Sequence, residues 1–111
     1  MSYERELLKG STDSLLLSLI NYQPMYGYQL IKDLQKRSKG YFQFKEGTLY
    51  PALHRLEKAG LVQGRWQRLP SGQERRYYHI TQKGRETLAE RLAVWQDFST
   101  AVALIIKPVT G

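Results

Sequence analysis

Basic side chains are concentrated in the middle of this chain of 111 residues. The whole chain has a net charge of +7, but residues 35–85 alone have +9, because twelve Lys and Arg residues accompany only three Glu residues there. The two ends together are slightly acidic. Ammonium and guanidinium groups gathered in one segment suit a polyanion such as a nucleic acid. Composition alone leaves open the alternative that these charges only aid solubility.

Part of this charge falls on two predicted strands. Within residues 61–68 and 74–80, side chains typical of β-strands alternate with other side chains. The segment 69–73 between them contains proline and glycine. This pattern predicts a β-hairpin. Each strand has two arginines: Arg65, Arg68, Arg75 and Arg76. We expect the four guanidinium groups to lie close together, where they could reach phosphates or a narrow minor groove.

Before the hairpin, the sequence predicts a helix over residues 46–59. Leu49, Leu53 and Leu56 form one apolar row, while Arg55 and other polar residues point elsewhere. Pro51 is tolerated only in the first turn of a helix, because further in its ring would clash with an earlier carbonyl group. We therefore expect the regular part of this helix to start late, or to be kinked near residues 47–48.

Three further helices are predicted. The apolar block from Leu7 to Ile20 indicates a buried helix that ends before Pro24. Apolar residues at helical spacing from Tyr26 to Leu34 indicate a second helix. We expect Thr81 to be the N-cap of a long last helix that reaches about residue 106 and is ended by Pro108.

The order helix, helix, basic-faced helix, hairpin, helix is that of a winged helix-turn-helix. We expect a mainly α fold with a small β-hairpin, in which the third helix can enter a DNA major groove. Residues 1–80 would form the DNA-binding domain, and residues 81–111 a C-terminal dimerisation helix and tail. The stretch 98–106 is apolar nearly all round, and a second copy of the chain would cover it.

Several function classes are excluded by the same sequence. There is no cysteine, and His54 and His79 have no partner at the spacing of metal ligands. No nucleophile elbow or phosphate-binding loop occurs. We therefore expect no catalytic residues, no metal and no cofactor. Without a secretory signal or an apolar run of about 18 residues, a cytoplasmic protein with no membrane partner is expected.

Five segments resemble the PadR family of bacterial transcriptional regulators. They are Leu16–Ile20, Met25-Tyr-Gly-Tyr-Gln-Leu30, Glu46–Val62, Arg75-Arg-Tyr-Tyr78 and Ile80-Thr-Gln-Lys-Gly84. Within the third, the run Gly47-Thr-Leu-Tyr-Pro-Ala-Leu53 is the most specific, and the likeness extends from about Leu7 to Ile106. The short, single C-terminal helix is similar to that of the subfamily with a compact dimerisation arm. The resemblance implies a homodimeric repressor that binds double-stranded DNA at an inverted-repeat operator.

The resemblance also implies which residues contact DNA. On the third helix, residues 46–59, which would be the recognition helix, they are Thr48, Tyr50, Pro51 and Arg55. Lys32 of the second helix would touch the DNA backbone. Lys45 stands where relatives often have a small polar capping residue. Since lysine cannot accept hydrogen bonds from the first N–H groups of the helix, its ammonium group would instead meet a phosphate.

Trp95 of the last helix has two possible roles. It could be an interface anchor, because that helix must be covered. In short PadR-like multidrug regulators, a tryptophan at the matching place faces its dimer mate across a pore. That likeness implies a planar aromatic or phenolic effector bound by Trp95, Asp97, Phe98 and Ser99. A winged-helix module that binds protein or RNA without an operator remains an alternative to the whole interpretation.

Overall fold

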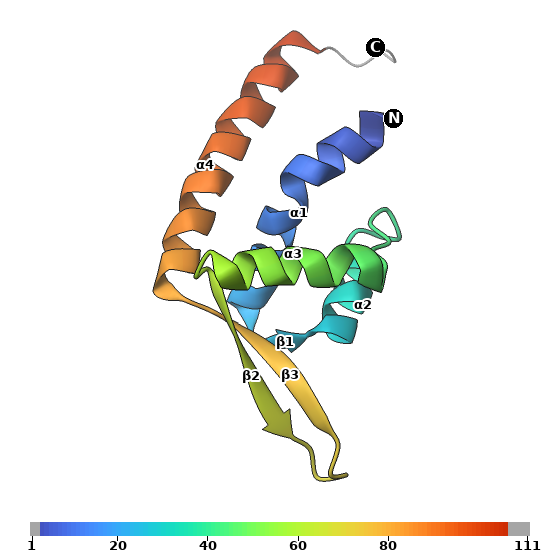
Figure 1. Cartoon of the computed structure of the whole chain (residues 1–111). Helices are drawn as coiled ribbons and strands as arrows, with labels where there is room; N and C mark the ends of the chain where they lie inside the picture. The colour runs from blue at the N-terminus through green and yellow to red at the C-terminus, as the bar shows by residue number, and fades with distance from the viewer. Residues whose placement is uncertain (1–2, 107–111) are drawn as a thin grey trace.

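Four helices lie at the base of a small antiparallel sheet whose hairpin projects away from them, and the last helix extends as an arm (Figure 1). The structure is a computed structural model and describes residues 3–106. The elements in chain order are α1 (Tyr3–Tyr22), β1 (Met25–Tyr26), α2 (Gly27–Arg37), α3 (Glu46–Lys58), β2 (Val62–Arg68), β3 (Glu74–Ile80) and α4 (Gln82–Ile105). This order confirms the predicted winged helix-turn-helix with a long C-terminal helix.

The hydrophobic core lies where α1, α2 and α3 meet the base of the hairpin. Its fully buried side chains include Leu16, Leu17, Leu30, Leu49 and Leu53. Burying each such side chain contributes about 1.5–3 kcal/mol. The predicted apolar row of α3 is therefore confirmed, and burying it turns the opposite face of α3 outward.

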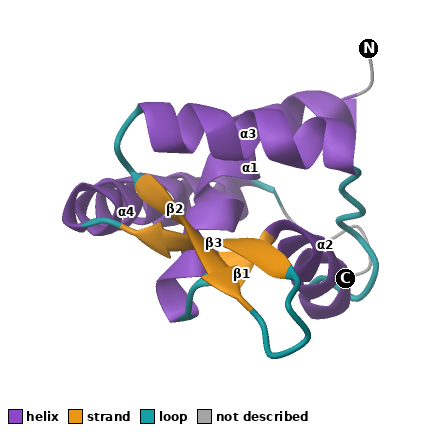
Figure 2. Ribbon diagram, turned by 60° about the horizontal axis from the view of Figure 1, so that its bottom comes forward, coloured by secondary structure: helices purple, strands orange, loops and turns teal. Residues whose placement is uncertain are grey.

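The sheet has the strand order β1-β3-β2, and α3 lies along one side of it (Figure 2). The predicted hairpin is confirmed, with pairs from Val62 and Ile80 at its base to Arg68 and Glu74 near its tip. The sequence did not predict β1. Tyr26, expected in the second helix, is instead a strand residue opposite Tyr77 and precedes the first residue of α2.

Helix α3 begins at Glu46 and continues without a break past Pro51, so the expected late start is wrong. The backbone N–H groups of Thr48 and Leu49 both donate to the carbonyl oxygen of Lys45, at 3.0 Å each. Pro51 leaves the carbonyl group of Gly47 without its usual donor. Gly47 is exposed in the first turn, where water can replace that donor, so the helix tolerates the proline.

Helix α4 is fixed at its start and exposed over most of its length. Thr81 caps it as predicted, accepting from the Gly84 N–H at 3.0 Å. Leu88 is buried, but Phe98, Leu104 and Ile105 are 58%, 79% and 80% exposed, which leaves a long apolar arm. Pro108, expected to end this helix, lies outside the described residues. Within residues 3–106, none of the helices is long and apolar enough to cross a membrane.

Candidate nucleic-acid interface

The outward face of α3 is the natural centre of a nucleic-acid interface. At 100° per residue, the side opposite the buried leucines carries Gly47, Pro51, His54 and Lys58, and all four are exposed. Pro51 was expected on this face, and Thr48 lies exposed at one edge of it. His54 and Lys58 were not singled out as DNA contacts from the sequence, although their spacing from Pro51 would have identified them.

At the edge of α3 that faces α1, Arg55 lies near an acidic residue. Its Nη2 is 3.5 Å from Oδ1 of Asp13, whose other oxygen is 3.9 Å from Nη1 of Arg91 on α4. The Arg55 side chain is 60% exposed, so this ion pair contributes little. Arg55 is therefore accessible to a ligand on the outside of α3.

At the opposite edge of α3, Tyr50 packs on Gly27 at the start of α2. A Cβ atom at Gly27 would overlap the hydroxyl end of Tyr50. Only glycine gives the ring this close approach. Two of the motifs noted in the sequence thus meet in one contact, which leaves Tyr50 45% exposed beside the outward face.

The strand register divides the four hairpin arginines between two faces of the sheet. Arg65 lies opposite Tyr77, and Arg75 lies opposite Gln67. Arg76 follows Arg75 directly in the chain and lies opposite Trp66. Since successive residues of a strand point to opposite faces, Arg68 shares its face with Trp66 and Arg76. The structure therefore does not bring the four guanidinium groups to one side of the hairpin, contrary to the expectation from the sequence.

Arg65 and Arg75 belong to the face of the sheet turned away from α3. The guanidinium carbon of Arg75 is 4.4 Å from the ring centre of Tyr26, which packs edge-on against Tyr77. Arg65 is exposed and donates to Gln63 at 3.1 Å. Burial, and secondarily the charge of Arg65, lower the pKa of His79 on the same face.

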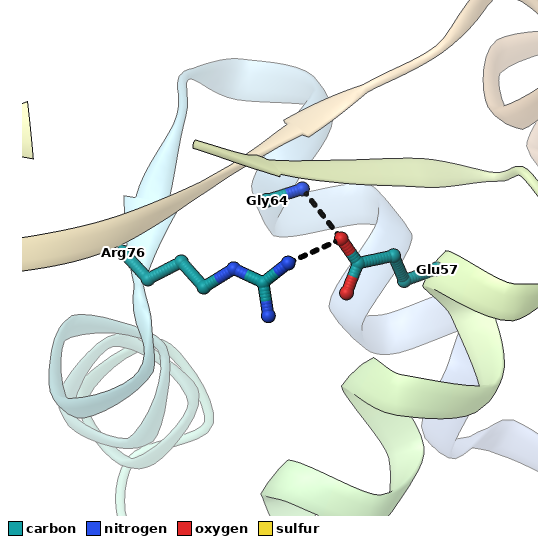
Figure 3. Close-up of polar contacts among 3 residues, drawn as sticks. All are labelled: Glu57, Gly64 and Arg76. Carbon is teal, nitrogen blue, oxygen red and sulfur yellow. Dashed lines mark hydrogen bonds and ion pairs between the residues drawn. The ribbon is translucent and has the colours of Figure 1, made fainter. Parts of the chain in front are cut away.

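Arg76 is held by an acidic residue of α3 (Figure 3). Its Nη2 donates to Oε2 of Glu57 at 2.6 Å, and the backbone N–H of Gly64 donates to the same oxygen at 3.1 Å. Arg68, by contrast, is exposed at the end of β2. On this face, Arg76 is therefore held by α3, whereas Arg68 is exposed at the end of its strand.

The two predicted lysine contacts are both exposed. Lys32 lies on α2 with its Nζ 5.2 Å from the ring centre of Tyr28. Lys45 is the N-cap residue of α3 and makes no side-chain capping bond, as expected from its chemistry. Both ammonium groups are accessible to a polyanion.

The residues predicted to bind an effector are only partly brought together. A groove of about 1290 Å³ lies between α1, α4 and residues 41–43, and Trp95 and Phe98 line it. Their rings are stacked, with centroids 6.1 Å apart. Asp97 and Ser99 are not among the described residues that line the groove. Among the side chains that the structure describes, no group of three His, Asp or Glu residues has the arrangement of a metal site.

Known proteins match this chain over most of its length. The family model described as "Transcriptional regulator PadR-like family" matches residues 16–90. A transcriptional regulator of Mycobacterium tuberculosis, Rv3488, is 45% identical over 68 residues, which cover 61% of this chain and 63% of that protein. An uncharacterized protein of Lysinibacillus sphaericus is 31% identical over 102 residues, covering 92% and 94%. A crystal structure of a PadR-like regulator from Bacillus cereus has a TM-score of 0.82 at 35% identity, covering 93% of this chain and 98% of that one.

Proposed function

Because the chain belongs to the PadR-like family of transcriptional regulators, we propose that it is a ligand-responsive repressor that binds an inverted-repeat operator as a homodimer. The observation that best supports DNA recognition is the outward face of α3, exposed from Gly47 to Lys58 and flanked by an arginine-bearing hairpin. An α-helix of this kind fits the major groove, where base pairs present distinct donors and acceptors.

In this proposal α3 reads bases and the surrounding cations hold the DNA backbone. Thr48, Pro51 and Arg55 approach base edges, and Tyr50 lies beside them. Phosphate contacts come from Lys32, Lys45 and three arginines of the hairpin. Arg65 and Arg68 are exposed, and Arg75 is half-buried. Phosphate contacts set register and affinity but not sequence preference, because every nucleotide carries a phosphate.

Dimerisation is proposed from the exposed apolar length of α4. Val94, Phe98, Leu104 and Ile105 are each at least 58% exposed. A two-fold partner is the commonest way to cover such a surface, and it would place two recognition helices about 34 Å apart, one turn of DNA. An inverted-repeat operator follows from that symmetry.

The proposed effector is a planar aromatic or phenolic molecule that stacks on Trp95. Support comes from the size of the groove and from the Trp95–Phe98 stack, which leaves Trp95 54% exposed. Asp97 and Ser99 would orient a polar substituent only if the partner copy brings them to the groove. Fluorescence quenching in a Trp66→Phe background tests this proposal. If no aromatic compound quenches Trp95, this tryptophan is an interface anchor.

A mobility-shift assay on DNA from upstream of the protein's own gene tests operator binding. We expect a specific complex, and Arg55→Ala and Thr48→Ala should each weaken it by about 1–3 kcal/mol and blur its sequence preference. Binding to a random duplex serves as the control. Equal affinity of the parent for both duplexes, or a preference for RNA, would contradict the proposal.

A further inference from the structure

Arg76 differs from the other hairpin arginines in that α3 itself provides its partner. We propose that Arg76 is a positioning residue: with Glu57 and Gly64 it fixes the hairpin against the recognition helix, and it makes no phosphate contact. We call these three residues the clasp. The inference rests on the proposed DNA binding by α3 and the hairpin, but its structural part can be tested without DNA.

The clasp joins three separate elements through one carboxylate oxygen (Figure 3). Oε2 of Glu57 on α3 accepts from Nη2 of Arg76 on β3 at 2.6 Å and from the N–H of Gly64 on β2 at 3.1 Å. A hydrogen bond between two charged groups at this distance is stronger than one between neutral groups. Both strands of the hairpin are thereby attached to α3.

The side chain of Arg76 reaches Glu57 only because residue 64 has no side chain. A Cβ atom at Gly64 would overlap Nε and Cζ of Arg76, so the guanidinium group crosses β2 directly above this glycine. The same guanidinium carbon is 5.6 Å from the ring centre of Tyr78. Packing as well as charge therefore holds Arg76 in place.

Burial and charge both argue against a phosphate contact by Arg76. The side chains of Arg76 and Glu57 are only 38% and 27% exposed, and within the described residues Nε of Arg76 is buried without a hydrogen-bond partner. Arg76 and Glu57 neutralise each other, so the pair releases no net counterion when DNA binds. The charge of Glu57, which would otherwise repel DNA beside α3, is compensated.

Glu57→Gln gives the sharpest test, because simple electrostatics and the clasp predict opposite changes in DNA affinity. Simple electrostatics predicts tighter DNA binding when a negative charge is removed. Since the substitution loses a charge-assisted hydrogen bond, the clasp predicts binding weakened by about tenfold or more. The probe is an operator duplex selected in vitro from random sequence with the parent protein. Affinity equal to or tighter than that of the parent would overturn the proposal.

Arg76→Lys and Arg68→Ala form a matched pair for the salt dependence of binding. Lysine keeps the charge but lacks the planar donor geometry, so the clasp predicts weaker operator binding with an unchanged salt slope. Arg68→Ala should instead reduce the slope by about one, as loss of a phosphate contact does. Parent-like affinity of Arg76→Lys, combined with a slope reduced by about one in Arg76→Ala, would contradict the proposal.

Hydrogen exchange of the Gly64 amide tests the clasp in the DNA-free protein. This N–H points to Glu57 from the free edge of β2, and Trp66, two residues on, has its amide on the same edge as a control. Exchange at Gly64 should accelerate in Glu57→Gln and Arg76→Lys, while exchange at Trp66 stays unchanged. Unaltered exchange at Gly64 in both variants would overturn the clasp. A parent protein that binds no DNA would instead refute the proposed function and leave this result standing.

Discussion

At the level of single residues, the contact between Gly27 and Tyr50 links the start of α2 to α3. Gly27→Ala should push the Tyr50 ring from its place, since the added Cβ overlaps the hydroxyl end of that ring. We expect a loss of about 1–3 kcal/mol in the free energy of unfolding, typical of overpacking, measured by urea denaturation.

Gly47→Ala is the matched control for that substitution. A Cβ atom at Gly47 has nothing within 4 Å, and alanine is the better helix former. Gly47→Ala should therefore leave stability unchanged or raise it slightly. If Gly27→Ala were equally harmless, Tyr50 would not depend on the glycine for its position.

His79 gives the folded state a pH dependence of known sign. Burial, and then the charge of Arg65, lower its pKa, so the folded protein binds a proton there less readily than the unfolded chain does. The stability contributed by neutral His79 is complete above its unfolded pKa of about 6.5, and is lost as the pH falls from there through the lowered folded pKa. Thermal unfolding between about pH 7 and pH 5 should show a smaller decrease in midpoint for His79→Gln than for the parent. Equal decreases would mean that His79 does not contribute.

At the scale of elements, Thr81 joins the end of α3 to the start of α4. Its hydroxyl group donates to the carbonyl oxygen of Gly60 at 2.6 Å and accepts from the N–H of Gly84 at 3.0 Å. Thr81→Val removes both bonds with little change of shape, and we expect a loss of about 1 kcal/mol in the free energy of unfolding. Thr100→Ala, at an exposed threonine of the same helix, is the control. A loss of equal size in both variants would show that the cap is not responsible.

The elements themselves could largely be predicted from the sequence. Helical spacing of leucines, a glycine-containing turn and the Thr81 cap are local signals, and they gave α1, α3, the hairpin and the start of α4. The two residues of β1 could not be predicted, because pairing with β3 rather than any local pattern makes them a strand. The start of α3 could not be predicted, because the effect of Pro51 on the helix depends on whether water reaches the carbonyl group of Gly47.

The candidate site was harder to predict than the elements. Counting arginines identified the hairpin as basic, but which face each arginine occupies depends on the pairing register. The partner of Arg76 is 19 residues earlier in the chain, so no local pattern reveals it. Thr48 and Pro51 were identified through the family resemblance, and the burial of the α3 leucines explains why both are exposed.

At the scale of the whole molecule, α4 extends from the core as an arm, and the described chain measures 57 × 28 × 25 Å. Leu104 and Ile105 are about four-fifths exposed on it. Covering each such side chain is worth about 1.5–3 kcal/mol, so Leu104→Glu combined with Ile105→Glu should shift a dimer toward monomers in sedimentation equilibrium. A parent protein that is monomeric at micromolar concentration would contradict the proposed assembly.

Hydroxyl-radical footprinting of the protein on DNA upstream of its own gene tests whether two recognition helices read one symmetric DNA site. We expect two protected half-sites of related, inverted sequence whose centres lie about one helical turn, 10 base pairs, or a multiple of that apart. A single protected half-site, or uniform protection without sequence preference, would show that the protein does not read such a site.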